Sequence, residues 1–281
     1  MVVTGASSGI GRACALDLAR RGFAVHATVR REEDARALER DAQGSELRPH
    51  LLDITDEAAV HATADTVAAA TGAMGLWGLV NNAGLALPGP VELLPIDQLR
   101  RQFEVNVIGQ VTVTQAFLPL IRRARGRIVN IGSVSGRVAA PFVGAYAASK
   151  HALRALNDSL RVEVRPFGVS VSLIEPAPIA TAIWERSAET SEAIRAGAPD
   201  ELRALYGGVL DAMPDISRAF GAHAVPPEAV CRAIRHALTA RRPRRRYCVG
   251  RHWLALWLAD QVPAGVKDWL MAVYLRRLRG R

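Results

Sequence analysis

Cysteine is scarce in this chain of 281 residues, and its three copies, Cys14, Cys231 and Cys248, are odd in number and widely separated. Such usage excludes a disulfide scaffold. No pair of Cys or His residues has the spacing of metal ligands, so the sequence predicts no metal site. We therefore expect a reduced, cytoplasmic protein.

Long apolar runs and a leader segment are also missing. No apolar stretch reaches the roughly 18 residues of a spanning helix, and the chain opens directly on the strand-like Val2 and Val3. We expect a soluble protein, surface-associated at most. Since strands commonly have about 5–6 residues, we also expect the natural start to lie a few residues upstream.

Lysine is the rarest charged residue, because only Lys150 and Lys267 stand among 34 arginines. Lys150 follows Tyr146 by four residues, so on a helix an ammonium lies beside a phenol. A cation lowers the phenol's pKa from its free value of roughly 10 toward the working range of a catalytic acid. A compact ammonium fits that role better than a planar guanidinium. The alternative is a chance pair on an amphipathic helix.

The net charge of +9 lies entirely within residues 241–281, where eleven basic residues accompany two acidic ones. The first 240 residues carry 25 charges of each sign. With 49% hydrophobic residues and alternating strand-like and helix-like segments, residues 1–250 predict one α/β domain. Residues 251–281 predict a basic, amphipathic helical extension.

A glycine-rich turn separates Val2 and Val3 from an Ala-rich, helix-periodic segment that ends near Arg21. Strand, tight turn and helix N-terminus form a pyrophosphate site, because unpaired backbone N–H groups point at the anion. The spacing here is G-x-x-x-G-x-G rather than G-x-G-x-x-G. The residues of this turn predicted to form the binding site are Gly5, Ser7, Ser8, Gly9, Ile10 and Gly11.

Four motifs in this order resemble the short-chain dehydrogenase/reductase family: 4–11, 81–84 (Asn-Asn-Ala-Gly), Ser133, and Tyr146 with Lys150. The resemblance covers about residues 1–180. Segments 75–80 and 173–176 resemble the branch that acts on steroids and retinoids. The resemblance implies a single-domain, doubly wound parallel sheet with strand order 3-2-1-4-5-6-7, holding a nicotinamide dinucleotide.

The resemblance also implies catalytic roles. Tyr146 exchanges the proton, Lys150 lowers its pKa and holds the ribose, and Ser133, chosen over Ser135 by its spacing, orients the substrate oxygen. Asn106, inside a helix predicted over 97–123, supports a proton relay through water. Its alternative role is to satisfy a distorted helical turn.

The second predicted strand, 23–29, ends in Arg30 and Arg31 without an acidic residue. An Arg at this place accommodates a 2′-phosphate, so NADP(H) is the predicted cofactor. The alternative is a solvated arginine pair balanced by the acidic residues at 32–34.

Asp53 follows a strand predicted over 47–52, and the resemblance implies that it contacts the adenine amine. Alternatively, Asp53 caps the helix predicted over 57–71. Where the family usually has Pro-Gly, this chain has Pro176 followed by Ala177. The resemblance assigns to the cofactor site, besides Asp53, Tyr146 and Lys150, the residues Ile54, Asn82, Ala83, Gly84, Pro176, Ile179 and Thr181.

Residues 182–225 break the alternation of strands and helices and carry scattered apolar side chains, which predicts a lid over an apolar substrate or a roof on the core. Beyond a helix ending near 240 and an edge strand at 247–249, the tail has an apolar stripe at helical spacing. Its members are Val266, Trp269, Leu270, Val273, Tyr274 and Leu278. Packing on the lid or a dimer partner is the favoured use. Contact with an anionic membrane, with Trp253, Trp257 and Trp269 at the interface, is the alternative.

Together these features predict an NADP(H)-dependent oxidoreductase acting on the carbonyl or secondary alcohol of a steroid-, retinoid- or lipid-like substrate. We expect a homodimer or homotetramer that pairs through helices 97–123 and 143–164. A non-catalytic NADP(H)-binding regulator is the first alternative. A nucleic-acid binder that uses the arginine-rich tail is the second, and the neutral body without a reading motif argues against it, so we expect no nucleic-acid partner.

Overall fold

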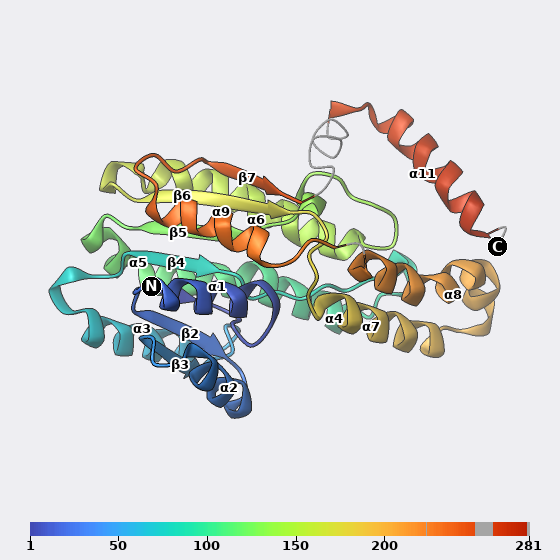
Figure 1. The fold of residues 1–281 in the computed structure, drawn as a ribbon. Helices are drawn as coiled ribbons and strands as arrows, with labels where there is room; N and C mark the ends of the chain where they lie inside the picture. Colours follow the sequence, from blue (N-terminus) through green and yellow to red (C-terminus); the bar gives the residue numbers. More distant parts are fainter. Residues whose placement is uncertain (223, 251–260, 280–281) are drawn as a thin grey trace.

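The computed structural model describes residues 1–222, 224–250 and 261–279, with side chains described except at 216–222 and 274–279. One sheet of seven parallel strands has the order β3-β2-β1-β4-β5-β6-β7, which confirms the predicted doubly wound topology (Figure 1). The strands are β1 (Val2–Val3), β2 (Val25–Val29), β3 (Leu47–Leu51), β4 (Gly78–Asn81), β5 (Arg127–Ile131), β6 (Ser170–Pro176) and β7 (Arg246–Val249).

Helices cover both faces of the sheet (Figure 1). The helices on one face are α1 (Gly9–Arg20), α2 (Glu32–Ala42) and α9 (Glu228–Thr239), and those on the other are α3 (Glu57–Thr71), α5 (Gly109–Ala124) and α6 (Gly144–Glu163). Because both faces are covered, central strands such as β2 and β4 are buried along their whole length. The edge strand β3 is partly exposed and contains Pro49, which is tolerated at an edge.

The predicted continuous helix over 97–123 is wrong, because the segment is interrupted. It consists of α4 (Ile96–Phe103), a π-helical turn η3 (Glu104–Ile108), and α5. Asn106 lies in the π-helical turn and is fully buried. The distorted turn considered for Asn106 is therefore present, as π-helical turns often are near functional sites.

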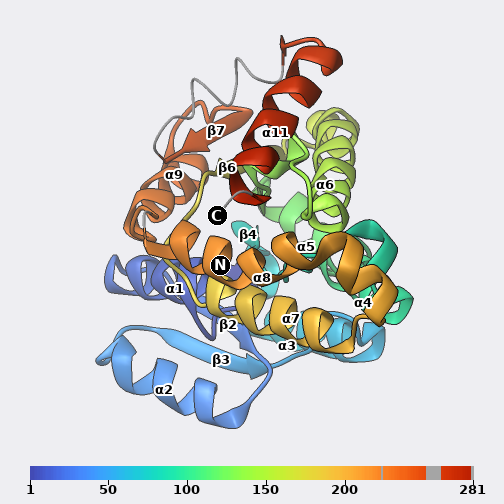
Figure 2. The same ribbon diagram turned by 90° about the vertical axis from the view of Figure 1, so that its right-hand side faces the viewer.

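Two antiparallel helices, α7 (Ile183–Gly197) and α8 (Asp200–Ala222), lie beyond the carboxyl ends of the strands (Figures 1 and 2). They correspond to the segment 182–225 that was predicted as a lid, of which residue 223 and the side chains of 216–222 lie outside the described part. Beneath this hairpin is an apolar cluster, separate from the two clusters that flank the sheet. Its buried members are Leu87, Leu94, Ala145, Ile194, Ala198, Val209, Leu210 and Met213.

The tail forms α11 (Ala264–Arg279), which runs from the side of β7 toward α8 and contacts that helix (Figure 1). Val266, Trp269 and Leu270 of the predicted stripe are 49%, 64% and 51% exposed. The chain's own lid therefore does not cover the stripe at these positions. Trp253 and Trp257 lie outside the described residues, as do the side chains of Tyr274 and Leu278. None of the described helices is long and apolar enough to cross a membrane.

Candidate active site

Three glycines bring the turn after β1 against two other cofactor segments. Gly5 and Gly9 have φ angles of 65° and 55°, which favour glycine. A Cβ at Gly5 would lie 2.8 Å from Cα of Ala83, and one at Gly9 would lie 2.9 Å from Cγ2 of Thr181. A Cβ at Gly11 would lie 2.3 Å from the Gly5 oxygen. The turn, the end of β4 and the loop after β6 therefore meet, as a pyrophosphate cradle requires.

The side chains in this turn leave polar groups for a ligand. Ser7, Ser8 and Ile10 are half-buried, and α1 begins after Ser8. The Ser8 hydroxyl makes no capping hydrogen bond to the described helix. Backbone N–H groups of the first turn of α1 therefore lie at one end of a helix dipole, where a phosphate is stabilised.

Asn82 shapes the turn through its amide. Its backbone N–H donates to Oγ1 of Thr4 at 2.9 Å, and its Nδ2 donates to the carbonyl oxygens of Thr4 and Gly5 at 3.0 and 3.1 Å. The N–H of Ala83 also donates to Thr4 Oγ1, at 3.1 Å, and Gln110 Nε2 donates to the Ala83 carbonyl at 2.8 Å. Thr4 and Gln110 were not predicted as site residues. Thr4 stands inside the glycine motif, whereas no sequence signal marks Gln110.

The two arginines after β2 have different surroundings. Arg31 forms ion pairs with Glu33 at 2.8 Å and Asp34 at 3.0 Å, so the acidic residues at 32–34 balance this arginine as considered. Arg30 is exposed, and no described residue forms an ion pair with it. Its guanidinium is therefore the one of the two that is available to an anion.

Asp53 does not cap α3, so that alternative is wrong, and Asp56 caps it instead. Asp53 accepts hydrogen bonds on Oδ1 from the N–H and the hydroxyl of Thr55, at 3.0 and 2.8 Å. Burial acts to raise the pKa of Asp53, but these hydrogen bonds and the charges of Arg30 and Arg101 lower it below its ordinary value. Asp53 is therefore an ionised acceptor near Arg30, while its neighbour Ile54 packs in the core.

Lys150 lies one helical turn after Tyr146 in α6, and its Nζ is 5.8 Å from the centre of the tyrosine ring. Nζ donates to the Ile131 carbonyl at 2.9 Å, which directs it toward the end of β5. Lys150 is 4% exposed, and burial lowers its pKa to about 8. Lys150 therefore titrates near physiological pH, unlike an exposed lysine.

Ser133 follows β5 and contacts Tyr146. Burial raises the pKa of the Tyr146 phenol, and a hydrogen bond with Ser133 acts in the opposite direction without cancelling this effect. The predicted lowering of this pKa by Lys150 is therefore wrong for the free protein, because desolvation of the buried phenol dominates. Ser133 Oγ also accepts a hydrogen bond from the Ser135 N–H at 3.1 Å, which fixes its position. Ser135 thus contributes its backbone N–H to the position of Ser133, and the catalytic role of Ser133 stays a prediction. The phenol is protonated at neutral pH, so it is positioned as a proton donor.

Asn106 connects the loop after β4 to the catalytic helix. Its Oδ1 accepts from the Leu85 N–H at 2.9 Å, and its Nδ2 donates to the Leu85 carbonyl at 2.9 Å and to Ser149 Oγ at 3.0 Å. A Cβ at Gly84 would lie 3.3 Å from Asn106 Oδ1 and 3.7 Å from Lys150 Nζ. Gly84 thus lets the β4 end approach both residues, and the relay role of Asn106 stays a prediction.

This chain has Ala177 after Pro176 where the family usually has glycine. Gly250, which follows the neighbouring strand β7, leaves room for the alanine methyl group. Gly250 has a φ of 121°, and a Cβ there would lie 2.6 Å from the Ala177 methyl. Further along, Ile179 is buried in the core and forms a parallel bridge with Val225. Ile179 therefore presents backbone rather than side chain to the cofactor side.

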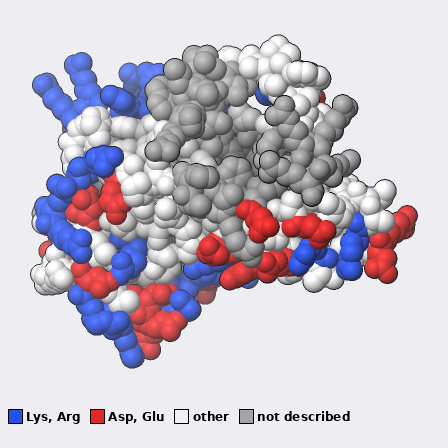
Figure 3. Space-filling view, turned by 45° about the vertical axis from the view of Figure 1, so that its right-hand side comes forward, with Lys and Arg blue, Asp and Glu red and all other residues white. Residues whose placement is uncertain are grey.

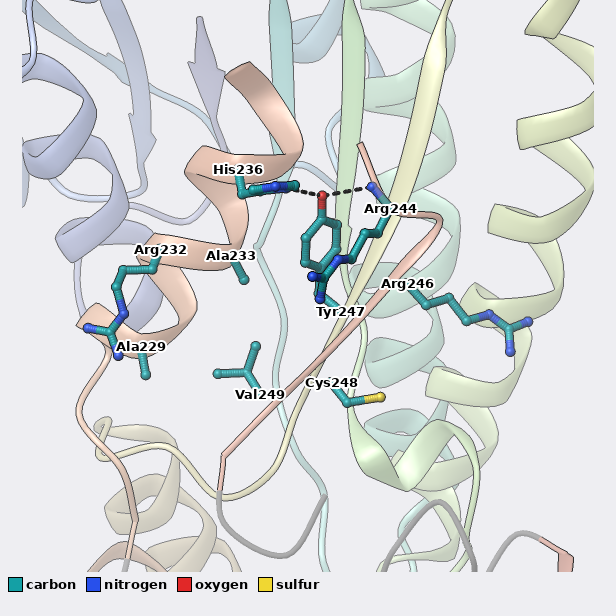
Figure 4. Close-up of a pocket in the computed structure, with 9 residues that line it drawn as sticks. All are labelled: Ala229, Arg232, Ala233, His236, Arg244, Arg246, Tyr247, Cys248 and Val249. Atoms are coloured by element: carbon teal, nitrogen blue, oxygen red, sulfur yellow. Dashed lines mark hydrogen bonds between the residues drawn. The ribbon is translucent and has the colours of Figure 1, made fainter. Parts of the chain in front are cut away.

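Two hollows lie outside the group formed by Ser133, Tyr146 and Lys150. One of about 760 Å³ adjoins the glycine turn, with Ser8, Gly9 and Thr181 in its wall. Another of about 490 Å³ lies between α9 and β7 (Figure 4). In the second, the Tyr247 hydroxyl accepts from the Arg244 N–H at 2.9 Å and lies 2.8 Å from Nδ1 of His236. Because the Tyr247 hydroxyl already has these two hydrogen-bond partners, we assign proton transfer to Tyr146 and not to Tyr247.

Within the described ranges, no group of three or more His, Cys, Asp or Glu side chains could hold a metal ion.

Comparison with known proteins extends these observations. The pattern described as short chain dehydrogenase matches residues 1–192. Retinol dehydrogenase 5 of Mus musculus is 42% identical over 282 residues, which cover 98% of this chain and 88% of that protein. An NADPH-dependent 3-dehydrocapnine reductase from Ornithobacterium rhinotracheale is 36% identical over 253 residues, covering 88% and 87%. The crystal structure of a short chain dehydrogenase/reductase from Burkholderia phymatum in complex with NAD has a TM-score of 0.77 and 27% identity, covering 96% and 94%.

Proposed function

This chain belongs to the short-chain dehydrogenase family, with similarity to its retinol dehydrogenase members, and on that premise we propose that it transfers a hydride between NADP(H) and the carbonyl or alcohol group of an apolar substrate. The observation that carries the proposal is the convergence of Ser133, Tyr146 and Lys150 next to the glycine turn. Gly84 approaches Lys150, and the preceding Ala83 contacts Gly5, so the proton donor and the cofactor cradle share one edge of the sheet.

The residues perform separate tasks in the reductive direction. The Ser133 hydroxyl orients the substrate oxygen, and Tyr146 donates its proton to that oxygen as negative charge develops there. The ammonium of Lys150 stabilises the phenolate that remains and binds the ribose hydroxyls. The glycine turn holds the pyrophosphate, while residues 176–181 position the nicotinamide, which supplies the hydride when bound.

Two features support an apolar substrate. The α7–α8 hairpin covers an apolar cluster whose member Ala145 directly precedes Tyr146 in the chain, and a relative with 42% identity is a retinol dehydrogenase. We propose that this hairpin acts as the lid. A screen of apolar ketones, aldehydes and secondary alcohols, followed by the absorbance of NADPH, tests the proposal. NADPH binding without turnover of any compound would favour the non-catalytic regulator.

Arg30 supports NADP(H) as the preferred cofactor, and replacing it with alanine is expected to narrow the preference for NADPH over NADH. A charged contact to the 2′-phosphate contributes about 1.5–3 kcal/mol, which corresponds to roughly one to two decades in affinity. Dissociation constants of both cofactors, measured by nucleotide fluorescence, give the ratio.

Arg31→Ala is the matched control, because Glu33 and Asp34 already hold this neighbouring guanidinium. Arg31→Ala should change the ratio of the NADPH and NADH dissociation constants by no more than about twofold, because the loss of a surface ion pair has a small effect. Equal affinity of the wild-type protein for NADPH and NADH would reject the assignment of Arg30.

The β7 side of the molecule also supports reversible docking on anionic lipid. Arg241, Arg242, Arg244 and Arg245, before β7, are exposed, and no described residue forms an ion pair with them. On the face drawn in Figure 3, basic and acidic side chains are interspersed along the left and lower parts, while the upper left corner is basic alone. In Figure 1, β7 runs along the upper edge of the molecule, with the segment before it at the left end and α11 at the upper right. Exposed apolar and basic groups on one side fit an anionic membrane surface.

Vesicle co-sedimentation tests this docking. Each basic residue near anionic lipid contributes about 1 kcal/mol, so the protein should pellet with phosphatidylserine vesicles at low salt and not with phosphatidylcholine vesicles. High salt, Trp269→Ala, or removal of the residues after Arg251 should weaken pelleting. Met74→Ala removes a side chain that is also exposed but lies outside α11, and should not. Absence of pelleting at low salt would leave packing as the role of the tail.

The homodimer or homotetramer stays a prediction. On the predicted assembly face, α6 exposes Leu156 and Val162, at 42% and 66%. Apolar side chains at this exposure are suited to pairing of α6 with a second copy across a two-fold axis.

A further inference from the structure

Phe142 has a backbone conformation that a bulky residue rarely adopts, with a φ of 65°. Among the described residues, the other non-glycine positions with positive φ are Gln43 and Arg125. These two are the C-caps of α2 and α5, where a left-handed residue commonly ends a helix. Phe142 instead precedes the catalytic helix α6. Helix capping does not account for its conformation, so its surroundings must impose it.

A hydrogen bond to a second unusual residue holds the Phe142 backbone. The Phe142 carbonyl accepts from the Gly89 N–H at 2.7 Å. Gly89 has a φ of 146°, and a Cβ there would lie 2.9 Å from Cδ2 of Leu94 and 3.2 Å from Cδ1 of Ile194. The loop after β4 is thus pressed between its own Leu94 and α7, and Phe142 is attached to that loop.

The Phe142 ring packs on the apolar cluster beneath the α7–α8 hairpin. The cluster contains Leu87 from the loop after β4, Met213 from α8, and Ala145, the residue before Tyr146. Phe142 is half-buried rather than enclosed. Its ring therefore lies between the start of the catalytic helix and the hairpin, with part of its surface left uncovered.

We infer that Phe142 is a specificity-determining residue: its ring is the wall against which the apolar body of the substrate packs while the carbonyl reaches Tyr146. The inference rests on the proposed function and adds the residue that selects among substrates. The left-handed backbone fixes the direction of a rigid aromatic face, which favours extended apolar bodies. A small substrate does not reach that face.

The test compares two aldehydes that share the reacting group and differ in bulk, all-trans-retinal and butanal, each with NADPH. Glycine accepts a positive φ, so Phe142→Gly removes the ring without adding strain. We expect kcat/KM for retinal to fall about tenfold or more, mainly through KM, and that for butanal to change less than about threefold. Phe142→Tyr, which keeps the ring, should hold the retinal-to-butanal ratio within about threefold of the wild type.

The melting temperature and the NADPH dissociation constant of each variant establish that the cofactor site is intact. If Phe142→Gly loses that site, Phe142→Asn takes its place, since asparagine also tolerates the left-handed region. If the wild type is active and removal of the ring leaves its retinal-to-butanal ratio of kcat/KM unchanged, the role of Phe142 is wrong. The proposed function is not affected by that result. A wild type that reduces neither aldehyde overturns the proposed function, and the inference with it.

Discussion

Tyr146→Phe is expected to remove most of the turnover while leaving NADPH bound. Loss of a positioned general acid lowers the rate roughly 10²- to 10⁴-fold. The ring still fills its place in α6, and only one hydroxyl is removed, so the NADPH dissociation constant should change less than about tenfold. Steady-state kinetics with a substrate from the screen, together with a fluorescence titration of NADPH, measure both quantities.

Tyr247→Phe is the matched control for this prediction. Tyr247 is 7% exposed and hydrogen-bonded to the Arg244 N–H, but it lies between α9 and β7, away from Ser133 and Lys150. Its variant should lose some stability and keep turnover. A Tyr146→Phe enzyme that works at nearly the wild-type rate would show that the proton comes from another group.

Lys150→Arg should also fail, although it keeps the positive charge. Lys150 Nζ is buried and donates to the Ile131 carbonyl at 2.9 Å, and Gly84 leaves little room beside it. A planar guanidinium is wider than an ammonium and cannot occupy this position without displacing the neighbours. We expect a loss in kcat/KM of roughly 10²-fold or more, comparable with the loss of a catalytic group.

The pH profile adds a second readout for Lys150. Burial lowers its pKa to about 8, so as the pH rises through 8 the free enzyme loses the ammonium that stabilises the Tyr146 phenolate. The wild-type kcat/KM for reduction should therefore fall above pH 8. Any residual activity of Lys150→Arg should lack this fall, because arginine stays charged.

Lys267→Arg, at the only other lysine, controls for the exchange itself. It lies in α11, and both the rate and the pH profile should stay as in the wild type. Retention of wild-type activity by Lys150→Arg would mean that charge alone suffices at this position.

Much of the fold was predictable from the sequence because parallel strands buried on both faces leave a strong pattern. The apolar runs indicated the strands, and the family resemblance, carried by the glycine turn and the Asn-Asn-Ala-Gly segment among other motifs, implied the strand order that the structure has. The interruption of the helix predicted over 97–123 was harder to predict from the sequence. Asn106 marked a polar feature inside a helix, but a π-helical turn depends on contacts with Leu85 and Ser149, far away in the chain.

The candidate site was predictable where spacing carries the information. The family resemblance pointed to Ser133 and Tyr146, which a hydrogen bond connects in the structure, and the four-residue spacing of Tyr146 and Lys150 places them on one helical face. The sequence did not show which of Arg30 and Arg31 stays available to an anion, because this depends on which of them forms ion pairs with the acidic residues of α2. Gly250, which accommodates Ala177, and Phe142, which is held by the loop after β4, also depend on contacts between distant segments.

Isotope transfer shows whether a hydride passes from NADPH to a bound carbonyl. The enzyme is mixed with NADPH that carries deuterium at the transferred position of the nicotinamide, together with the carbonyl panel, and the alcohol products are analysed by mass spectrometry. At least one apolar alcohol should contain the deuterium, and Tyr146→Phe should largely abolish its formation. Tight binding of NADPH without deuterium in any product would contradict the account and support a non-catalytic, cofactor-binding protein.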